Sequence, residues 1–505
     1  MHGARMPDVT VAIVGSGFAG IAMAASLRRA GLTDLVLLER AADLGGTWRD
    51  NSYPGAACDV PSHLYSFSFA PNPGWSRSFS PQPEIWAYLR RVADQEGVTG
   101  KIRFGEEVIG ARWDPAGCRR RVETTAGTVT ARFLVSATGP LSDPMIPDIP
   151  GLATFAGAVF HSAAWDHDHD LAGQNVAVIG TGASAIQFVP QIQPLAGRLT
   201  VFQRTPAWIM PRHDRQISGL ERWLFRHVRV TQRLARAAIY CGREAYALGF
   251  VKKPAIMRAA QHIALRHLRR QVADPDLVAR LTPSYAMGCK RVLLSSDYYP
   301  ALAKPNVSLV TEPIKEIRRD CVLTGDGTAH HADTLIFGTG FHVTDFPFAH
   351  RVVGADGVSL ASSWSAERAR TAFRGTTTAR FPNLFVLTGP NTGLGHNSQV
   401  FMIEAQVRYV RGAITHARRH GVDRVEVRPE AQDAYDAMVR RKMRGTVWAT
   451  GGCTSWYLDA DGRNLALWPD FTWAYAWRTR RFDPASYHLA RAHTHAAFPA
   501  GSPAR

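Results

Sequence analysis

Residues 9–20 read VTVAIVGSGFAG, and this stretch decides the fold. Its first six residues form a short, mostly β-branched run, which is typical of a buried strand. Glycines at 15, 17 and 20 follow at once, then the helical pattern IAMAASLRRAG and a second strand, LVLLER, at 35–40. Strand, glycine loop, helix and strand in this order predict a unit that binds a dinucleotide, with its pyrophosphate over the helix N-terminus.

The same arrangement returns at 175–204, where NVAVIG is followed by TGASAIQFVPQI and LTVFQR. The two units differ in the charge that ends the second strand. Glu39 ends it in the first unit, and a carboxylate there binds the hydroxyls of an adenosine ribose. Arg204 ends it in the second unit, where a cation suits the 2′-phosphate that a carboxylate would repel. This contrast predicts FAD in the first unit and NADPH in the second.

The chain is therefore predicted to be an α/β protein with two Rossmann-like dinucleotide-binding domains and a helical insertion. Three prolines in DPMIPDIPG (143–151) suit a crossing between domains. TLIFGTG (334–340) ends the second domain, and NLFVLTGPN (383–391) is the expected last strand of the first. The predicted parts are an FAD-binding domain at 7–145 and 343–495, an NADPH-binding domain at 152–214 and 281–342, the insertion at 215–280, and an unstructured tail at 496–505.

Composition sets the protein class. Of 505 residues, 46% are hydrophobic and 20% charged, which favours a packed globular protein. The eight residues before the first strand leave no room for a secretory leader, and no stretch approaches the roughly 20 apolar residues of a membrane span. A cytoplasmic protein is expected. The cysteines have no metal-ligand or redox-dithiol spacing, so small buried thiols are expected at all six positions (58, 118, 241, 289, 321 and 453) and no metal site is predicted.

The net charge of +17 is concentrated in one segment. Between Arg215 and Arg270 there are thirteen Lys or Arg residues, against Glu221 and Glu244. No nucleic-acid motif accompanies this charge, so no nucleic-acid partner is predicted. The favoured interpretation is a solvated helical surface. A peripheral contact with an anionic membrane stays open.

Two longer motifs point to a family. GGTWRDNSYPGAACD (45–59) fits [AG]-G-x-W-x-x-x-x-[FY]-P-[GM]-x-x-x-D, and FAGAVFHSAAWD (155–166) fits F-x-G-x-x-x-H-x-x-x-W-[PD]. Both patterns belong to the type I Baeyer–Villiger monooxygenases, which the chain resembles from about Val9 to Tyr487. Related flavin N- and S-monooxygenases usually carry Tyr-Lys where this chain has Trp165-Asp166, and they remain the alternative. A non-catalytic binder driven by the basic segment is the third possibility.

The resemblance implies an enzyme that uses NADPH, FAD and O₂ to convert a ketone or aldehyde into an ester or lactone, as a monomer or homodimer. In this family a flavin peroxide attacks the carbonyl carbon, and an arginine beside the flavin keeps it anionic. GCKRVLLSSDYY (288–299) resembles the segment with that arginine. Arg291 is the implied stabiliser, Asp59 its partner, and Lys290 joins Arg204 at the 2′-phosphate.

The remaining site residues follow from the motifs and the resemblance. The predicted FAD contacts are Gly15, Ser16, Gly17, Gly20, Glu39, Gly46, Thr47, Trp48, Asp59, Tyr65, Val108 and Gln399. The predicted NADP contacts are Gly180, Thr181, Gly182, Ser184, Ala185, Gln187, Arg204, Thr205, Lys290, Arg291 and Trp456. The family motif comprises Phe155, Gly157, His161, Trp165 and Asp166, and its histidine is expected to couple domain movement to cofactor position rather than to exchange protons.

Overall fold

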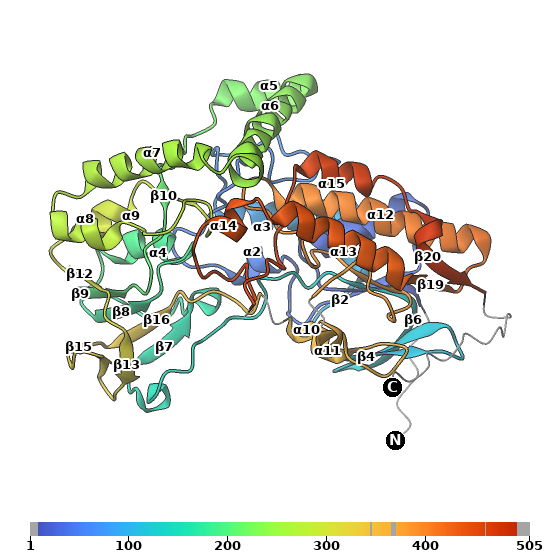
Figure 1. Cartoon of the computed structure of the whole chain (residues 1–505), viewed down its shortest axis with the longest axis horizontal. Coiled ribbons are helices and arrows are strands. Elements are labelled where there is room, and N and C mark those ends of the chain that lie inside the picture. Colours follow the sequence, from blue (N-terminus) through green and yellow to red (C-terminus); the bar gives the residue numbers. More distant parts are fainter. Residues whose placement is uncertain (1–8, 344–345, 365–369, 460, 492–505) are drawn as a thin grey trace.

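The computed structural model describes residues 9–343, 346–364, 370–459 and 461–491 (Figure 1). Of the predicted parts, the tail at 496–505 lies outside these ranges, as do residues 7 and 8, 344–345, 365–369, 460 and 492–495 of the predicted FAD-binding domain. No helix in the described ranges is long and apolar enough to cross a membrane.

The larger sheet forms around the first glycine loop. β1 is an interior strand of this sheet and pairs in parallel with β2 on one side and β6 on the other. The strand order is β17-β4-β5-β6-β1-β2-β3, and β18 also pairs with β6. The strands are β1 (Val9–Val14), β2 (Leu35–Leu38), β3 (Ile102–Arg103), β4 (Val108–Asp114), β5 (Arg119–Thr124), β6 (Gly127–Ser136), β17 (Val352–Val353) and β18 (Leu384–Val386). One sheet thus combines strands from 9–136 with strands from 352–386.

The second sheet is parallel and draws all of its strands from between 158 and 337. Its order is β12-β9-β8-β16-β7. The strands are β7 (Ala158–His161), β8 (Asn175–Ile179), β9 (Arg198–Phe202), β12 (Val307–Val310) and β16 (Thr334–Phe337). Beside it lies an antiparallel sheet of β13 (Ile314–Ile317), β14 (Cys321–Thr324) and β15 (Ala329–His331), and two further strand pairs are β10 (Ile209–Met210) with β11 (Leu293–Leu294) and β19 (Arg424–Val427) with β20 (Tyr487–Ala490).

Helices cover both sheets. α1 (Phe18–Arg29) packs against α12 (Gln399–His420) over the larger sheet, and α4 (Ala185–Ile192) packs against α9 (Tyr298–Leu302) over the second. The other helices of the larger sheet's half are α2 (Thr47–Asp50), α3 (Gln82–Gln95), α10 (Pro347–Arg351), α11 (Leu360–Ser363), α13 (Pro429–Met443), α14 (Val447–Thr450) and α15 (Thr472–Arg478). Apolar side chains of these helices and of the strands beneath them form a separate core for each sheet.

Four helices follow the second sheet's first half. They are α5 (Gly219–His227), α6 (Arg229–Ala247), α7 (Ile256–Gln271) and α8 (Pro275–Leu281), with a π-helical turn at Leu248–Lys252. In Figure 1 α7 lies above the second sheet, while α5 and α6 project from the top of the molecule.

The chain crosses between the two sheets at 143–145 and again at 340–342. The two crossings are hydrogen-bonded to each other, because the Met145 amide donates to the Gly340 carbonyl (2.9 Å) and the His342 amide to the Asp143 carbonyl (3.0 Å). The two halves are therefore joined where the crossings meet.

The prediction for the cysteines is wrong for four of the six. Cys289 and Cys453 form a disulfide across a sequence separation of 164 residues. Cys241 is exposed and Cys118 partly exposed, whereas Cys58 and Cys321 are buried free thiols. Sequence spacing identifies local pairs only, so it gives no signal for two cysteines that the fold brings together from distant segments.

Candidate active site

The first glycine loop leaves a backbone cradle at the start of α1. Gly15 has a φ of 99°, and a Cβ on Gly20 would lie 1.9 Å from the Gly15 carbonyl oxygen, so the helix can approach the strand only without a side chain. The loop at 45–46 crosses this point, since a Cβ on Gly46 would lie 3.3 Å from the Gly17 Cα atom. Gly17 caps α1 with no side-chain hydrogen bond. This bare helix N-terminus fits the pyrophosphate of FAD.

Glu39 lies beside the cradle and is buried. Its Oε2 atom accepts hydrogen bonds from the amide and the hydroxyl of Ser16 (3.0 and 2.7 Å). Its Oε1 atom accepts from the Ala41 amide and from Arg49 Nη1, each at 3.0 Å. The carboxylate is thus fixed at the carboxyl end of β2, the place from which it can bind the adenosine ribose.

In the second loop the helix also approaches the neighbouring segment closely, but glycine and alanine have changed places. A Cβ on Gly180 would lie 2.5 Å from the Gly338 carbonyl oxygen, as one on Gly15 would lie 2.8 Å from that of Ala137. The first unit has Gly20 on its helix and Ala137 on the neighbouring segment. The second unit has Ala185 on its helix and Gly338 opposite, where an added Cβ would lie 3.3 Å from that of Ala185. At each point where a helix meets the neighbouring segment, there is therefore room for one methyl group.

Two cations lie at the edge of the second loop. Burial and the nearby charge of Arg204 lower the pKa of Lys290, whose Nζ atom lies 5.1 Å from the ring centroid of Tyr285. Among the described residues, neither Arg204 nor Lys290 has a carboxylate partner within ion-pair distance. Like charges held together without a counter-charge fit a bound anion, and the 2′-phosphate of NADPH is the anion that the loop would present to them.

Asp59 and Arg291 form an ion pair between distant segments. Arg291 Nε and Nη2 both donate to Asp59 Oδ2, at 2.9 and 2.5 Å. The side chains keep 33% and 26% of their exposure, so the pair borders open space. Asp59 raises the pKa of Arg291, and although burial opposes ionisation of Asp59, the charge of Arg291 holds the pKa of that carboxyl below its usual value. Both groups are charged throughout the neutral range.

Two further residues reach this pair, and sequence reasoning missed both. Arg243 of α6 donates to the Asp59 carbonyl (3.1 Å) and lowers the pKa of its carboxyl. Burial raises the pKa of Tyr457 to about 12, and the nearby charge of Arg291 opposes that rise. Arg243 stands among the thirteen cations of the basic segment and Tyr457 beside the more conspicuous Trp456, so no spacing signal distinguishes them.

The motif at 45–59 also joins the two halves. Tyr53 Oη donates to Gln187 Oε1 of α4 (3.0 Å), and Gln187 Nε2 donates to the Ala57 carbonyl (3.0 Å). A Cβ on Gly55 would lie 2.8 Å from the Gln187 carbonyl oxygen, so α4 packs directly on this turn. Both polar atoms of the Gln187 side chain are therefore used in the contact between halves, and the nucleotide contact predicted for this residue stays a prediction.

His161 lies next to the place where the crossings meet. Its Nδ1 atom accepts from the Ala163 amide (3.1 Å), and its ring contacts Phe341 edge-on at 5.7 Å between centroids. Burial lowers its pKa, against the opposing effect of the Gly340 backbone. In the same motif, a Cβ on Gly157 would lie 2.1 Å from the Asp333 carbonyl oxygen, and the Trp165 ring contacts Phe188 of α4. His161 thus lies beside the crossing at 340–342, whereas Gly157 and Trp165 pack within the second half.

The other predicted contacts are dispersed around the two loops. Trp48 Nε1 donates to Tyr65 Oη (3.0 Å), and Gln399 at the start of α12 donates to the Thr392 carbonyl (3.1 Å). Trp456 is 46% exposed. The remaining positions are Thr47 at the start of α2, Val108 at the start of β4, Thr181 with its hydroxyl 3.4 Å from the Thr205 carbonyl, Ser184 at the cap of α4, Phe155, which is partly buried, and Asp166, which accepts from the Asp168 amide.

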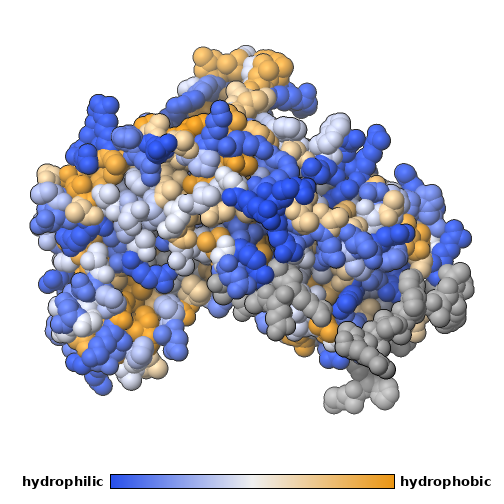
Figure 2. Space-filling view, viewed as in Figure 1, coloured by the Kyte–Doolittle hydropathy of each residue, from blue (hydrophilic) through white to orange (hydrophobic). Residues whose placement is uncertain are grey.

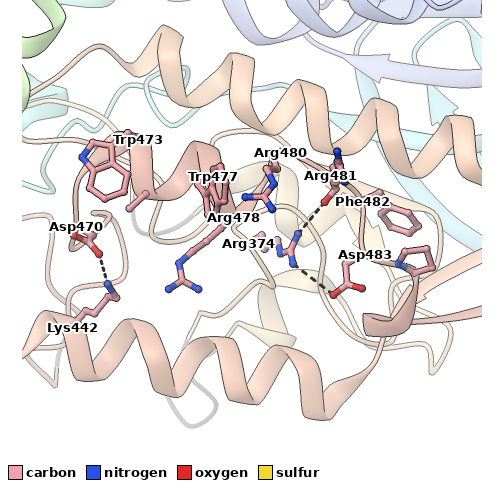
Figure 3. A pocket seen from close by; sticks show the side chains of 12 residues that line it. Arg374, Lys442, Asp470, Trp473, Trp477, Arg478, Arg480, Arg481, Phe482 and Asp483 are labelled. Carbon is pink, nitrogen blue, oxygen red and sulfur yellow. Dashed lines mark hydrogen bonds and ion pairs between the residues drawn. The ribbon is translucent and has the colours of Figure 1, made fainter.

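A surface pocket of about 670 Å³ lies elsewhere, beside α15 (Figure 3). Arginines, Lys442, Trp473 and Trp477 line it, and Arg374 pairs there with Asp483. None of the predicted site residues lines this pocket. The described residues contain no cluster of His, Cys, Asp and Glu that could hold a metal ion.

Comparison with known proteins agrees with this geometry. A family model described as pyridine nucleotide-disulphide oxidoreductase matches residues 12–235. A Baeyer–Villiger monooxygenase of Streptomyces coelicolor is 55% identical over 96% of this chain and 93% of its own length. One of Pseudomonas aeruginosa is 48% identical over 95% of this chain and 91% of its own length. The crystal structure of OTEMO in complex with FAD and NADP superposes with a TM-score of 0.86 at 27% identity, covering 96% of this chain and all of that one.

The predicted fold class, with its FAD and NADP Rossmann-like domains, is confirmed, and so are the two cofactors and the resemblance. The ketone oxygenation expected from Trp165-Asp166 is favoured over the N- and S-oxygenase alternative. The chain belongs to the type I Baeyer–Villiger monooxygenases, the FAD-containing, NADPH-dependent flavoprotein monooxygenases.

Proposed function

We propose that Arg291, oriented by Asp59, stabilises the negative charge that develops on the oxygen of a ketone or aldehyde as it is converted to an ester or lactone. Bound FAD supplies a redox centre that NADPH reduces and that activates O₂. In the overall reaction the carbonyl compound, O₂, NADPH and one proton give the ester, NADP⁺ and water. The protein's part is to place a fixed cation beside the reacting carbonyl.

The ion-pair geometry carries the proposal. Two nitrogens of one guanidinium edge donate to a single carboxylate oxygen, which leaves Nη1 of Arg291 free of that carboxylate. Because Asp59 raises the pKa of Arg291, the guanidinium keeps its charge through the reaction. Arg243 holds the Asp59 backbone from the other side, so the carboxylate is fixed before the substrate binds.

A substrate panel tests the reaction class. The FAD-loaded protein is supplied with NADPH and with linear, cyclic and aryl ketones, aldehydes, amines and sulfides. We expect ketone-dependent NADPH consumption matched by ester or lactone in equal amount. Oxidation of amines or sulfides alone, with no ester from any carbonyl compound, would contradict the proposal.

Localisation and oligomeric state belong to the same proposal. We place the enzyme in the cytoplasm, as a monomer or homodimer, and fractionation with light scattering tests both. Cytosolic thiol buffers keep most cysteines reduced, so Cys289 and Cys453 are expected as thiols in growing cells and as a disulfide in oxidised preparations. Alkylation of the two thiols in fresh lysate measures this directly.

A further inference from the structure

The face of α6 toward the protein carries hydrogen-bonded polar side chains beside Ile239 and Tyr240, which pack against the core. Arg236 Nη1 donates to the carbonyls of His63 (2.7 Å) and Ser66 (3.0 Å). Glu244 is buried and accepts from Asn397 Nδ2 and from the Thr472 amide. The inward-facing set, at helical spacing, is Gln232, Arg236, Arg243 and Glu244. Polar contacts thus dock this helix on the body of the protein.

The opposite face of α6 carries apolar residues into solvent. Val230 is 55% exposed and Leu234 65%. The exposed stripe comprises Val230, Leu234, Ala237, Ala238, Cys241 and Ala245. On α5, Leu220 is 69% and Trp223 53% exposed, and α7 also exposes Ile256 and Ile263. Figure 2 shows hydrophobic residues gathered at the top of the molecule, where α5 and α6 project. Large apolar side chains gathered in solvent on one projection mark an interaction site.

The charge around this apolar stripe has one sign. Exposed cations flank it on all three helices, namely Arg222, Arg226, Arg229, Arg233, Arg258, Arg266, Arg269 and Arg270. The segment 215–270 contains only two acids. Glu221 is paired with Arg215, and Glu244 is buried under α6. The outward face thus combines apolar side chains with unopposed positive charge.

We propose that α5, α6 and α7 dock this enzyme on an anionic phospholipid bilayer, with the apolar stripe in the interface and the arginines at the headgroups. A tryptophan and leucines flanked by cations are the composition of interfacial helices. A second copy of the chain fits poorly, because a symmetric contact would bring the same arginines together. A projecting helical pair also matches a deformable bilayer better than a protein surface, which would need a groove to receive it.

Vesicle flotation tests this docking. The FAD-loaded full chain is floated with vesicles of phosphatidylcholine alone and with vesicles containing phosphatidylglycerol at equal parts. We expect binding only to the anionic vesicles and its loss at high salt. Binding to neither kind, or equal binding to both, would overturn the proposal.

Two aspartate variants identify the face that binds. Leu234→Asp should weaken anionic-vesicle binding at least tenfold. Trp477→Asp is the matched control, because Trp477 is 66% exposed and lies beside Arg478 and Arg480 on a different helix. Ketone-dependent NADPH turnover without vesicles should be unchanged in both, which shows that each variant is folded. If Trp477→Asp abolished binding and Leu234→Asp did not, the assigned face would be wrong.

A charge pair separates lipid from a second copy. Arg226→Glu with Arg229→Glu should reduce vesicle binding more than tenfold, at about fivefold for each charge removed, whereas Arg419→Glu at the exposed end of α12 should leave it unchanged. Light scattering of the same proteins measures their oligomeric state and so tests the alternative, a second copy of the chain. A dimer that dissociates in Leu234→Asp would assign the stripe to the partner subunit instead of the bilayer.

Discussion

At the residue scale, the proposed mechanism depends on one guanidinium, that of Arg291. Arg291 is held by Asp59 and lies next in sequence to Lys290, which shares its surroundings with Arg204. Adjacent residues of one segment therefore serve different functions in the proposed mechanism, one at the reacting carbonyl and one at the cofactor phosphate. Their effects should be separable by substitution.

Replacing Arg291 by Ala should abolish ester formation and leave flavin reduction by NADPH largely intact. A removed charge-stabilising donor commonly costs a hundredfold or more in turnover, because the developing negative charge loses its partner. Stopped-flow absorbance measures reduction, and gas chromatography measures ester. Arg291→Lys, which keeps the charge but loses the fork on Asp59, is the control and should retain partial activity. Undiminished ester in Arg291→Ala would refute the role.

Replacing Arg204 by Ala should raise the KM for NADPH about tenfold or more and leave the KM for NADH nearly unchanged. A charged hydrogen bond to phosphate contributes about 1.5–3 kcal/mol to binding. NADH has no 2′-phosphate, so its binding does not include this hydrogen bond. Steady-state kinetics with both cofactors gives the ratio. Arg198→Ala is the control, because Arg198 is also exposed and lies at the other end of β9 from Arg204, which follows that strand. An unchanged preference for NADPH would contradict the assignment of Arg204 to the 2′-phosphate.

The role of a single residue could be predicted only where that residue lies within a recognisable sequence motif. The glycine spacing and the opposite charges of Glu39 and Arg204 assign the cofactors without a structure. Arg243 and Tyr457 could not be found this way, because their contacts with the ion pair are made by segments far apart in sequence. Gln187 shows the reverse case, since its position in a helix after a glycine loop suggests nucleotide binding while its side chain bonds to Tyr53 and Ala57.

At the scale of elements, the strands were the most predictable part. β1 and β8 begin at the residues where the apolar runs begin, because a buried parallel strand needs continuous apolar sequence. α6 was predicted as a helix but its orientation was not. Sequence periodicity assigns apolar residues to the core, and Ile239 and Tyr240 pack there. Val230 and Leu234 instead face solvent, on the side of α6 away from the hydrogen bonds of Arg236.

Mild acid should loosen α5 and α6. Burial lowers the pKa of His63, which lies against Phe225 and Gln232, to about 4. The pKa of this histidine is lower in the folded chain than its unfolded value near 6.5, so the folded chain binds fewer protons. Its contribution to the stability of the folded contact is therefore complete above pH 6.5 and falls as the pH drops toward 4. At pH 5 the loss is about 2 kcal/mol.

Hydrogen exchange of α5 and α6 at pH 7.5 and pH 5, corrected for intrinsic rates, measures this effect. The contact with the body should open more readily at pH 5 in the native chain. His63→Gln removes the titrating group and should make the corrected rates of these helices nearly equal at the two pH values. Equal opening in the native chain at both pH values would contradict the assignment.

At the scale of the whole molecule, two sheets with separate cores are held together by hydrogen-bonded crossings, by Gln187 and by a disulfide. The disulfide joins the segment that bears Arg291 to the segment that bears Tyr457. Both cysteines belong to an apolar cluster that also includes side chains of α7 and α14. Only the complete fold brings these segments together, so this connection was beyond sequence reasoning.

Reduction of this disulfide should lower the Tm. Closing a loop of this length stabilises a folded chain by up to about 5 kcal/mol, because it restricts the unfolded chain. Differential scanning calorimetry with and without a phosphine reductant measures the change. The double variant Cys289→Ser, Cys453→Ser should melt at the temperature of the reduced protein and be insensitive to the reductant. An unchanged Tm on reduction would show that the bond contributes nothing to stability.

The same bond changes how the polypeptide is connected. With Cys289 and Cys453 linked, the backbone between them closes on itself as a covalent macrocycle, and the crossing at 340–342 lies on its circumference. A protease that nicks the ring once therefore releases no fragment. The nicked chain should migrate as one band on a denaturing gel without reductant and as two with it, so the electrophoretic pattern reports whether the ring was closed when the protease acted.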